Sequence, residues 1–156
     1  MTARYHVLAI GNALVDVITA AEPAFLAAQG IPKGVMRLID ADTAEALYGA
    51  MGPGREISGG SAANTLAGMA ALGARTQFVG RVADDQLGRV FAHDIRAAGV
   101  DFATPASTGG APTGRCLIIV TPDGDRTMNT FLGACQELSE ADLDEATVAA
   151  AEILYL

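Results

Sequence analysis

The sequence predicts an α/β fold in which a doubly wound parallel sheet carries a second, small β-sheet. Three observations predict it. Short apolar segments typical of buried parallel strands alternate along the chain with segments of helical periodicity. The segment 61–72 is Ala-rich and apolar on nearly every face, as expected of a helix buried against a sheet. From residue 114 to 131 the alternation gives way to two extended segments around the turn Pro122–Asp125, a β-hairpin pattern. Alternating strands and helices are typical of a parallel sheet covered by helices.

The same patterns predict the individual elements. Strands are expected at residues 7–10, 14–18, 35–39, 76–82, 114–121, 126–131 and 152–156. Helices are expected at residues 23–29, 42–51, 61–72, from 84 or 85 to 98, and from 139 onward. Asp42–Glu45 and Ser139–Asp142 have the spacing of capping boxes at helix starts. Gly73 and Gly99 follow the last periodic residues of two helices, where a helix commonly ends.

Composition excludes several classes of protein. The chain is 51% hydrophobic and 18% charged, which indicates a globular domain. A net charge of −8 argues against nonspecific binding of nucleic acid. No apolar run approaches the roughly 18–20 residues that cross a bilayer, and no signal-type cleavage region follows the N-terminus, so we expect a cytoplasmic protein without a membrane partner. The two cysteines and two histidines show no metal-ligand spacing, so no metal site is expected.

The segment Gly59-Gly60-Ser61-Ala62-Ala63-Asn64 carries the clearest chemical signal. Two glycines before a helix allow positive φ and a close approach of the backbone to a ligand. The free amide groups of the helix start can receive ligand oxygens, and Asn64 offers a hydroxyl group both a donor and an acceptor. A plain glycine-rich turn with Asn64 facing solvent is an equally open interpretation of the spacing alone.

Two better-known glycine motifs do not fit this segment. A Walker A loop ends in Gly-Lys-Ser/Thr, whereas the only lysine of the chain is Lys33. The nucleophile elbow of serine hydrolases needs a glycine where Ala63 stands, and no Asp and His pair follows it.

Asp16 and Arg126 are the other candidate site residues. Asp16 lies in an apolar strand, and alternation places it on the face opposite Val15 and Val17. It is either a strand carboxylate that faces water or an acceptor whose two oxygens fit the adjacent hydroxyls of a sugar. Arg126 follows the hairpin turn, where it is either solvated or holds the hairpin to the body by pairing with Asp16 or another acid.

Taken together, these segments resemble the ribokinase-like (PfkB-type) carbohydrate and nucleoside kinases, in particular their adenosine-kinase-like branch. The resemblance covers nearly the whole chain. It rests on Gly11–Asp16, Gly59–Ala67, Leu72–Ala74, Phe78–Val82, Asp84–Gly88, Pro112–Cys116 and Asp125–Thr130. An ordered series of this length is far more specific than one glycine pair.

The resemblance implies a Rossmann-like core with a small β-sheet lid over the substrate. The lid segments are expected at about residues 12–20, 34–39 and 102–131, inserted in one domain that spans residues 1–156. Family positions that hold substrate hydroxyls match Asp16, Gly59, Gly60 and Asn64, and Asn12 fits the same pocket. In the adenosine-kinase-like branch the lid walls a base, a role for which Met36, Cys116, Met128 and Thr130 are candidates.

The resemblance also implies ATP and Mg²⁺, and a catalytic aspartate in a Gly-Ala-Gly-Asp motif that this sequence does not contain. The chain stops within an apolar strand pattern, so we expect it to be the acceptor-binding N-terminal half of a kinase. We expect that half to be inactive alone, with no catalytic residue of its own. The expected partner is a small sugar or nucleoside, and the second expected partner is another copy of the chain, in a homodimer through the lid or an exposed sheet edge. The alternative is a non-catalytic module that binds a sugar or nucleoside.

Overall fold

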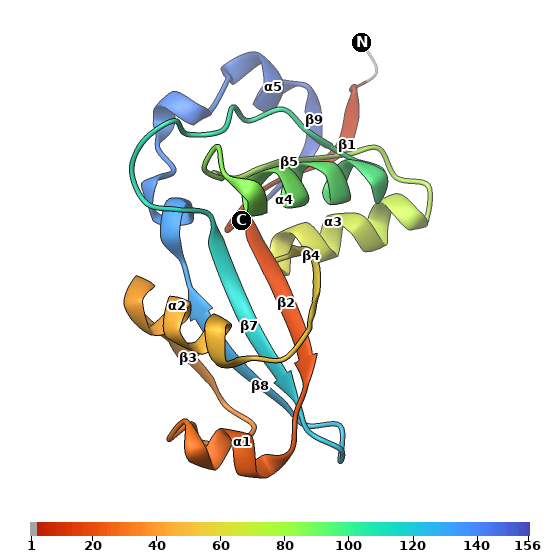
Figure 1. The fold of residues 1–156 in the computed structure, drawn as a ribbon. Coiled ribbons are helices and arrows are strands. Elements are labelled where there is room, and N and C mark those ends of the chain that lie inside the picture. Colours follow the sequence, from red (N-terminus) through yellow and green to blue (C-terminus); the bar gives the residue numbers. More distant parts are fainter. Residues whose placement is uncertain (1–2) are drawn as a thin grey trace.

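A computed structural model describes residues 3–156 and shows two β-sheets with helices packed around them (Figure 1). The first sheet is parallel throughout and has the strand order β6-β5-β1-β9. Its strands are β1 (Tyr5–Ile10), β5 (Thr76–Val79), β6 (Val100–Phe102) and β9 (Ala151–Tyr155). The predicted α/β class with a parallel sheet and a second sheet is therefore confirmed.

The winding of the first sheet reverses at β1. From β1 the chain continues to β5 and β6 on one side, and β9 then pairs with β1 on the other side. Ile10 lies opposite Val79 of β5, while Ala9 lies opposite Tyr155 of β9. In an open parallel sheet, such a reversal leaves a crevice beyond the carboxyl ends of the two strands. The crevice here lies beyond the carboxyl ends of β1 and β9.

The second sheet is mixed and extends away from the first (Figure 1). Its order is β3-β8-β7-β2-β4, with parallel pairs β3–β8 and β2–β7 and antiparallel pairs β7–β8 and β2–β4. The strands are β2 (Leu14–Ala20), β3 (Met36–Leu38), β4 (Arg55–Gly59), β7 (Gly114–Val120) and β8 (Arg126–Phe131). Helix α1 (Pro23–Ala28) lies at the far end of this sheet, and α2 (Ala41–Ala50) contacts β7 and β8.

Helix α4 (Gln86–Ala97) joins the two sheets, because it contacts β6 of the first and both β2 and β4 of the second. Its Phe91 packs with Phe78 of β5 and Phe102 of β6, with ring centroids 5.8 and 5.3 Å apart. Phe78 and Phe91 are completely buried. Helix α3 (Ser61–Ala71) covers β1 and β5. Aromatic packing thus fixes α4 to the first sheet, and α4 in turn supports the second.

Residues 132–156 return from the second sheet to the first. They contain the 3₁₀ helices η1 (Gly133–Glu137) and η2 (Glu140–Asp142) and the helix α5 (Glu145–Ala149), which contacts β9. Within residues 3–156, no helix combines the length and the apolar character that crossing a membrane requires.

The structure differs from the sequence expectations at two helix starts. Helix α2 is capped by Asp40, whose side chain accepts a hydrogen bond from the Thr43 amide at 2.8 Å, so the capping box expected at Asp42 is wrong by two residues. The box at Ser139 does form, but it opens only the short helix η2, since Leu143 leaves the helical conformation. Asp144 then caps α5.

Two short strands, β4 and β6, were not predicted from the sequence. Strand β4 completes the second sheet although it lies outside the three segments expected to form the lid. Strand β6 ends at Phe102 and pairs with β5 of the first sheet, whereas the third segment expected for the lid starts at residue 102. Three to five residues are too few to show a periodicity of their own.

The capping difference gives a direct prediction. Asp40→Ala should lower the midpoint of urea unfolding, because it leaves the Thr43 amide without its side-chain acceptor. Asp42→Ala should lower the midpoint less, since Asp42 lies in the first turn and contributes through the helix dipole alone. Equal midpoints for the two variants would contradict the assignment of Asp40 as the cap.

Candidate functional site

A cavity of about 770 Å³ opens between the two sheets, at the reversal of winding. Its floor comes from the end of β1 and the start of α3, and its wall from one face of the second sheet. The end of β9 closes one side. The lining residues are Ile10, Gly11, Asn12, Leu14, Asp16, Met36, Leu38, Gly60, Ser61, Ala62, Asn64, Cys116, Ile118, Arg126, Met128, Thr130, Leu132, Tyr155 and Leu156. Every candidate site residue except Gly59 lines this one cavity.

The two glycines before α3 are needed for different reasons. Gly60 has φ 97°, and a Cβ atom there would lie 2.4 Å from the carbonyl oxygen of Asn12. Gly59 does not have positive φ, but a Cβ atom on it would lie 2.3–2.4 Å from the carboxyl group of Asp16. Gly59 is therefore a site residue indirectly, since its missing side chain leaves room for Asp16.

Helix α3 presents its N-terminal turn to the cavity. No side chain caps this turn, whose Ser61 and Ala62 line the cavity. The amide of Asn64 donates to the Gly60 carbonyl in the first helical bond, and this places the Asn64 side chain at the cavity one turn into the helix. A ligand oxygen would meet free amides and the positive end of the helix dipole there.

Asp16 lies on β2 between Ile57 of β4 and Cys116 of β7. The side chains of Val15 and Val17 are buried on the other face, as alternation predicts. Burial raises the pKa of Asp16, and the positive charge of Arg126 offsets part of this rise. Among residues 3–156, no donor forms a hydrogen bond or ion pair with the Asp16 carboxyl group. Both of its oxygens are available to a ligand.

Arg126 lines the cavity at the start of β8. In the described part of the chain it pairs neither with Asp16 nor with another acid, so the ion pair considered for it is not formed. Its positive charge acts on Asp16 through space and offsets part of the rise in the pKa of Asp16.

The wall of the cavity consists of neighbouring side chains on three strands. Met36 of β3 lies opposite Met128 of β8, and Cys116 of β7 lies opposite Thr130 of β8. The Thr130 hydroxyl donates to the Cys116 sulfur at 3.3 Å. Burial raises the pKa of Cys116, against the opposing effect of this hydrogen bond, so Cys116 remains a neutral thiol. Together these residues form a largely apolar surface on the same face of the second sheet as Asp16, which is the neighbour of Cys116, and Asn64 of α3 lines the same cavity.

Sequence reasoning missed several lining residues. Leu38, Ile118 and Leu132 lie two positions from residues that were candidates, and strict alternation along each strand could have found them. Tyr155 and Leu156 enter only because β9 pairs with β1, a pairing that no local pattern reveals.

Strand β4 is an edge strand, and α4 holds it in place. The amide of Ser58 donates to a carboxyl oxygen of Asp94 on α4 at 2.8 Å. This bond satisfies a backbone donor of a strand that pairs only with β2. Gly59 and Gly60 directly follow Ser58. Asp94 therefore helps to fix the glycine pair that precedes α3.

A magnesium site is not evident in the part of the chain that the structure describes. In residues 3–156, no three His, Cys, Asp or Glu side chains gather closely enough to hold a metal ion. The described residues therefore do not fit the Mg²⁺ ion that the family resemblance implies, and none is assigned to it.

Comparison with known proteins identifies the family. Residues 37–156 match the pfkB family carbohydrate kinase model. The solved structure of adenosine kinase from Sinorhizobium meliloti is 55% identical with a TM-score of 0.90, covering 98% of this chain and 47% of that one. A probable sugar kinase from Rhizobium etli CFN 42 is 50% identical with a TM-score of 0.90, covering 98% of this chain and 46% of that one.

A curated relative is more distant in sequence. The 5-dehydro-2-deoxygluconokinase of Geobacillus kaustophilus is 34% identical over 101 residues, which are 63% of this chain and 30% of that protein. The chain thus spans about half the length of the two solved structures and matches about a third of the curated relative. With a family model that covers most of its residues, and the fold of the two solved structures, the chain belongs to the pfkB family of carbohydrate kinases.

Proposed function

We propose that this chain forms the acceptor-binding site of an ATP-dependent kinase that phosphorylates the primary hydroxyl of a nucleoside or sugar. The observation that carries the proposal is the unpaired Asp16 carboxylate, which faces the same cavity as the Asn64 side chain and the open turn of α3. A carboxylate with two free oxygens fits two adjacent hydroxyls of a furanose ring, and an amide supplies a further donor or acceptor. In this proposal Asn12 and the Gly59–Gly60 pair complete the floor.

The wall favours a nucleoside within this class. Met36, Cys116, Met128 and Thr130 form a largely apolar face of the second sheet, across the cavity from Asn12 and Asn64. Flexible thioether side chains pack well against a planar ring. A ligand with a polar sugar and a planar base matches both sides of the cavity, whereas a free hexose matches only the floor. The S. meliloti structure, named adenosine kinase, supports the same choice.

The second sheet would act as a lid in this reaction. By holding the acceptor between the floor and the wall, it would orient the primary hydroxyl and exclude water that would otherwise hydrolyse ATP. This chain's residues would bind and orient the acceptor. Membership of a carbohydrate kinase family supports ATP as the phosphoryl donor.

The test is a coupled assay of ADP release by the product of the complete reading frame that contains this chain. Adenosine, inosine, ribose and fructose are offered at equal concentration with ATP and Mg²⁺. We expect the highest kcat/KM for a nucleoside. Turnover of fructose or ribose with no turnover of a nucleoside would reject the nucleoside assignment. Binding of an acceptor in calorimetry without any turnover would instead show a non-catalytic binding module.

A further inference from the structure

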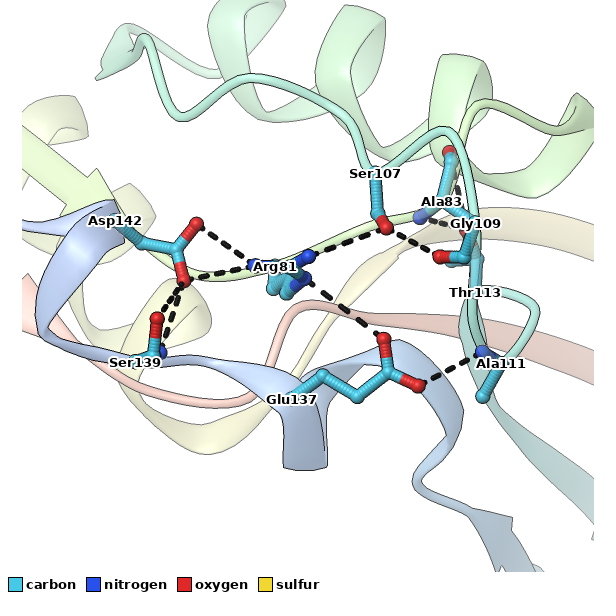
Figure 2. Close-up of polar contacts among 9 residues, drawn as sticks. All are labelled: Arg81, Ala83, Ser107, Gly109, Ala111, Thr113, Glu137, Ser139 and Asp142. Atoms are coloured by element: carbon cyan, nitrogen blue, oxygen red, sulfur yellow. Dashed lines mark hydrogen bonds and ion pairs between the residues drawn. The ribbon is translucent and has the colours of Figure 1, made fainter.

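The base of the β7–β8 hairpin meets the end of the first sheet at a half-buried arginine, Arg81. The chain enters β7 through residues 103–113 and leaves β8 through residues 132–142. These two segments lie side by side, since the Ala134 amide donates to the Pro112 carbonyl at 2.9 Å. Arg81, just beyond the end of β5, extends its side chain between them (Figure 2).

Arg81 contacts both segments at once. One terminal nitrogen of its guanidinium group lies 3.0 Å from each carboxyl oxygen of Asp142, and the other donates to the Ser107 hydroxyl at 3.2 Å. Its Nε lies 4.0 Å from a carboxyl oxygen of Glu137. The Arg81 side chain is 25% exposed and that of Asp142 only 11%, so solvent screens their pair weakly. We call Arg81, Ser107, Glu137 and Asp142 the Arg81 network.

The neighbours of Asp142 stabilise its charged form. Burial favours its neutral form, but hydrogen bonds from Ser139 and Arg81, together with the Arg81 charge, hold the pKa of Asp142 below its ordinary value. The Ser139 amide and hydroxyl both donate to the oxygen that also faces Arg81 (Figure 2). Asp142 is therefore ionised at neutral pH and fixes the segment that follows β8.

The segment that precedes β7 is tied down as well. Glu137 accepts a hydrogen bond from the Ala111 amide at 2.8 Å, and the Ser107 amide donates to the Val82 carbonyl at 2.8 Å. Thr113, which is 1% exposed, donates from its amide and its hydroxyl to Asp85 at the start of α4, at 2.9 and 2.7 Å. The anchored residue Thr113 directly precedes β7, and Cys116 of the cavity wall follows three positions later.

We propose that Arg81 is a positioning residue for the acceptor, which it does not touch. It fixes both ends of the β7–β8 hairpin to the end of β5. It thereby sets the distance between the second sheet, which carries Asp16 and the wall, and the first sheet, where Asn12 follows β1 and α3 carries Asn64. Arg81 is not among the residues that line the cavity. The proposal rests on the proposed function only for the second arm of its test, which measures the KM for an acceptor.

The first arm of the test needs no ligand. In the complete protein, Arg81→Gln should make backbone amides in residues 105–113 and 132–142 exchange hydrogen at least about tenfold faster, as expected for the loss of local protection. Exchange in β1 and β5 should not change. The matched control is Arg89→Gln, because Arg89 is 68% exposed and, among the described residues, forms an ion pair with Asp84 alone. Unchanged exchange in the two segments would overturn the proposal.

The second arm separates positioning from stability. With adenosine and ATP as substrates, Arg81→Gln should raise the KM for adenosine at least about fivefold and leave the KM for ATP within about twofold. A variant that only loses folded molecules lowers the apparent kcat and leaves KM unchanged. Faster exchange with an unchanged adenosine KM would therefore also overturn the proposal.

A second variant covers a failure of Arg81→Gln to fold. Asp142→Asn keeps an oxygen for Ser139 but removes the charge that Arg81 faces. It should show the same pattern of exchange and KM to a smaller degree, and no change in either would count against the role of Arg81. A wild-type protein that phosphorylates no acceptor would reject the proposed function instead, while the exchange measurement would still decide whether Arg81 fixes the hairpin.

Discussion

Asp16→Asn should weaken acceptor binding roughly ten- to a hundredfold and at the same time stabilise the folded protein. A hydrogen bond to a charged group contributes about 1.5–3 kcal/mol, and the proposed function gives Asp16 two ligand hydroxyls and no protein donor. The loss should appear in the dissociation constant of the nucleoside measured by calorimetry. Glu152→Gln is a suitable control, because Glu152 is exposed on β9 and does not line the cavity.

The gain in stability follows from the raised pKa of Asp16. Because burial raises this pKa in the folded state, the folded protein binds a proton at Asp16 more readily than the unfolded chain does. Ionisation of Asp16 therefore reduces the free energy of unfolding above the raised pKa, and this cost declines as the pH falls through the raised pKa and is absent below the ordinary pKa of aspartate. Asparagine carries no charge at any pH, so the variant should have the higher urea midpoint in alkaline solution and lose that advantage in acid.

Acceptor affinity should have the opposite dependence on pH. The ionised carboxylate is the form that accepts two hydroxyl protons, so wild-type affinity should fall as Asp16 becomes protonated, at a higher pH than for an ordinary aspartate. The Asn variant should show no such fall. Affinity within twofold of wild type, or equal stability at every pH, would contradict the role given to Asp16.

Gly60→Ala should destabilise the protein by about 3 kcal/mol or more. Two effects combine at this position. The backbone has φ 97°, which L side chains rarely adopt, and the new Cβ atom would lie 2.4 Å from the Asn12 carbonyl oxygen. Relief requires a shift of the Asn12 loop or of α3, so nucleoside affinity should fall along with stability.

Gly73→Ala separates these two effects. Gly73 has φ 91°, but nothing lies within 4 Å of the atom that alanine would add. Gly73→Ala should lose only the conformational part of the unfolding free energy, about 1–2 kcal/mol, and should keep the wild-type affinity for the nucleoside. Equal losses of unfolding free energy for the two variants in urea would show that the contact with Asn12 contributes nothing.

Local sequence patterns predicted the strand that buries one face and the helix that is apolar on nearly every face. The alternation around Asp16 placed Val15 and Val17 in the core, and the apolar segment 61–72 became α3, buried against β1 and β5. Periodicity predicts such elements because burial restricts the residue type at every buried position along them. The two candidate caps of α4 were adjacent aspartates, and the structure selects Asp85, which accepts from the Gly88 amide.

The features that were not predicted depend on pairing over long distances. Strand β9 adds Tyr155 to the cavity only because it pairs with β1, at the opposite end of the chain. Strand β4 joins the second sheet through β2 and Asp94 rather than through any pattern of its own. The wall residues Met36 and Met128 were inferred from family resemblance, since their parallel register cannot be read from either strand alone.

The fit of Asp16 into the space left by Gly59 has a consequence for anyone who wishes to redesign this pocket. Any side chain at residue 59 would occupy the space of the Asp16 carboxyl group. Random mutagenesis at residue 59 should therefore return almost no functional clones. Residues 36 and 38 are different, because Met36 is 58% and Leu38 63% exposed and both have open space to fill. A library aimed at a new acceptor should therefore diversify strand β3 and leave the glycine as it is.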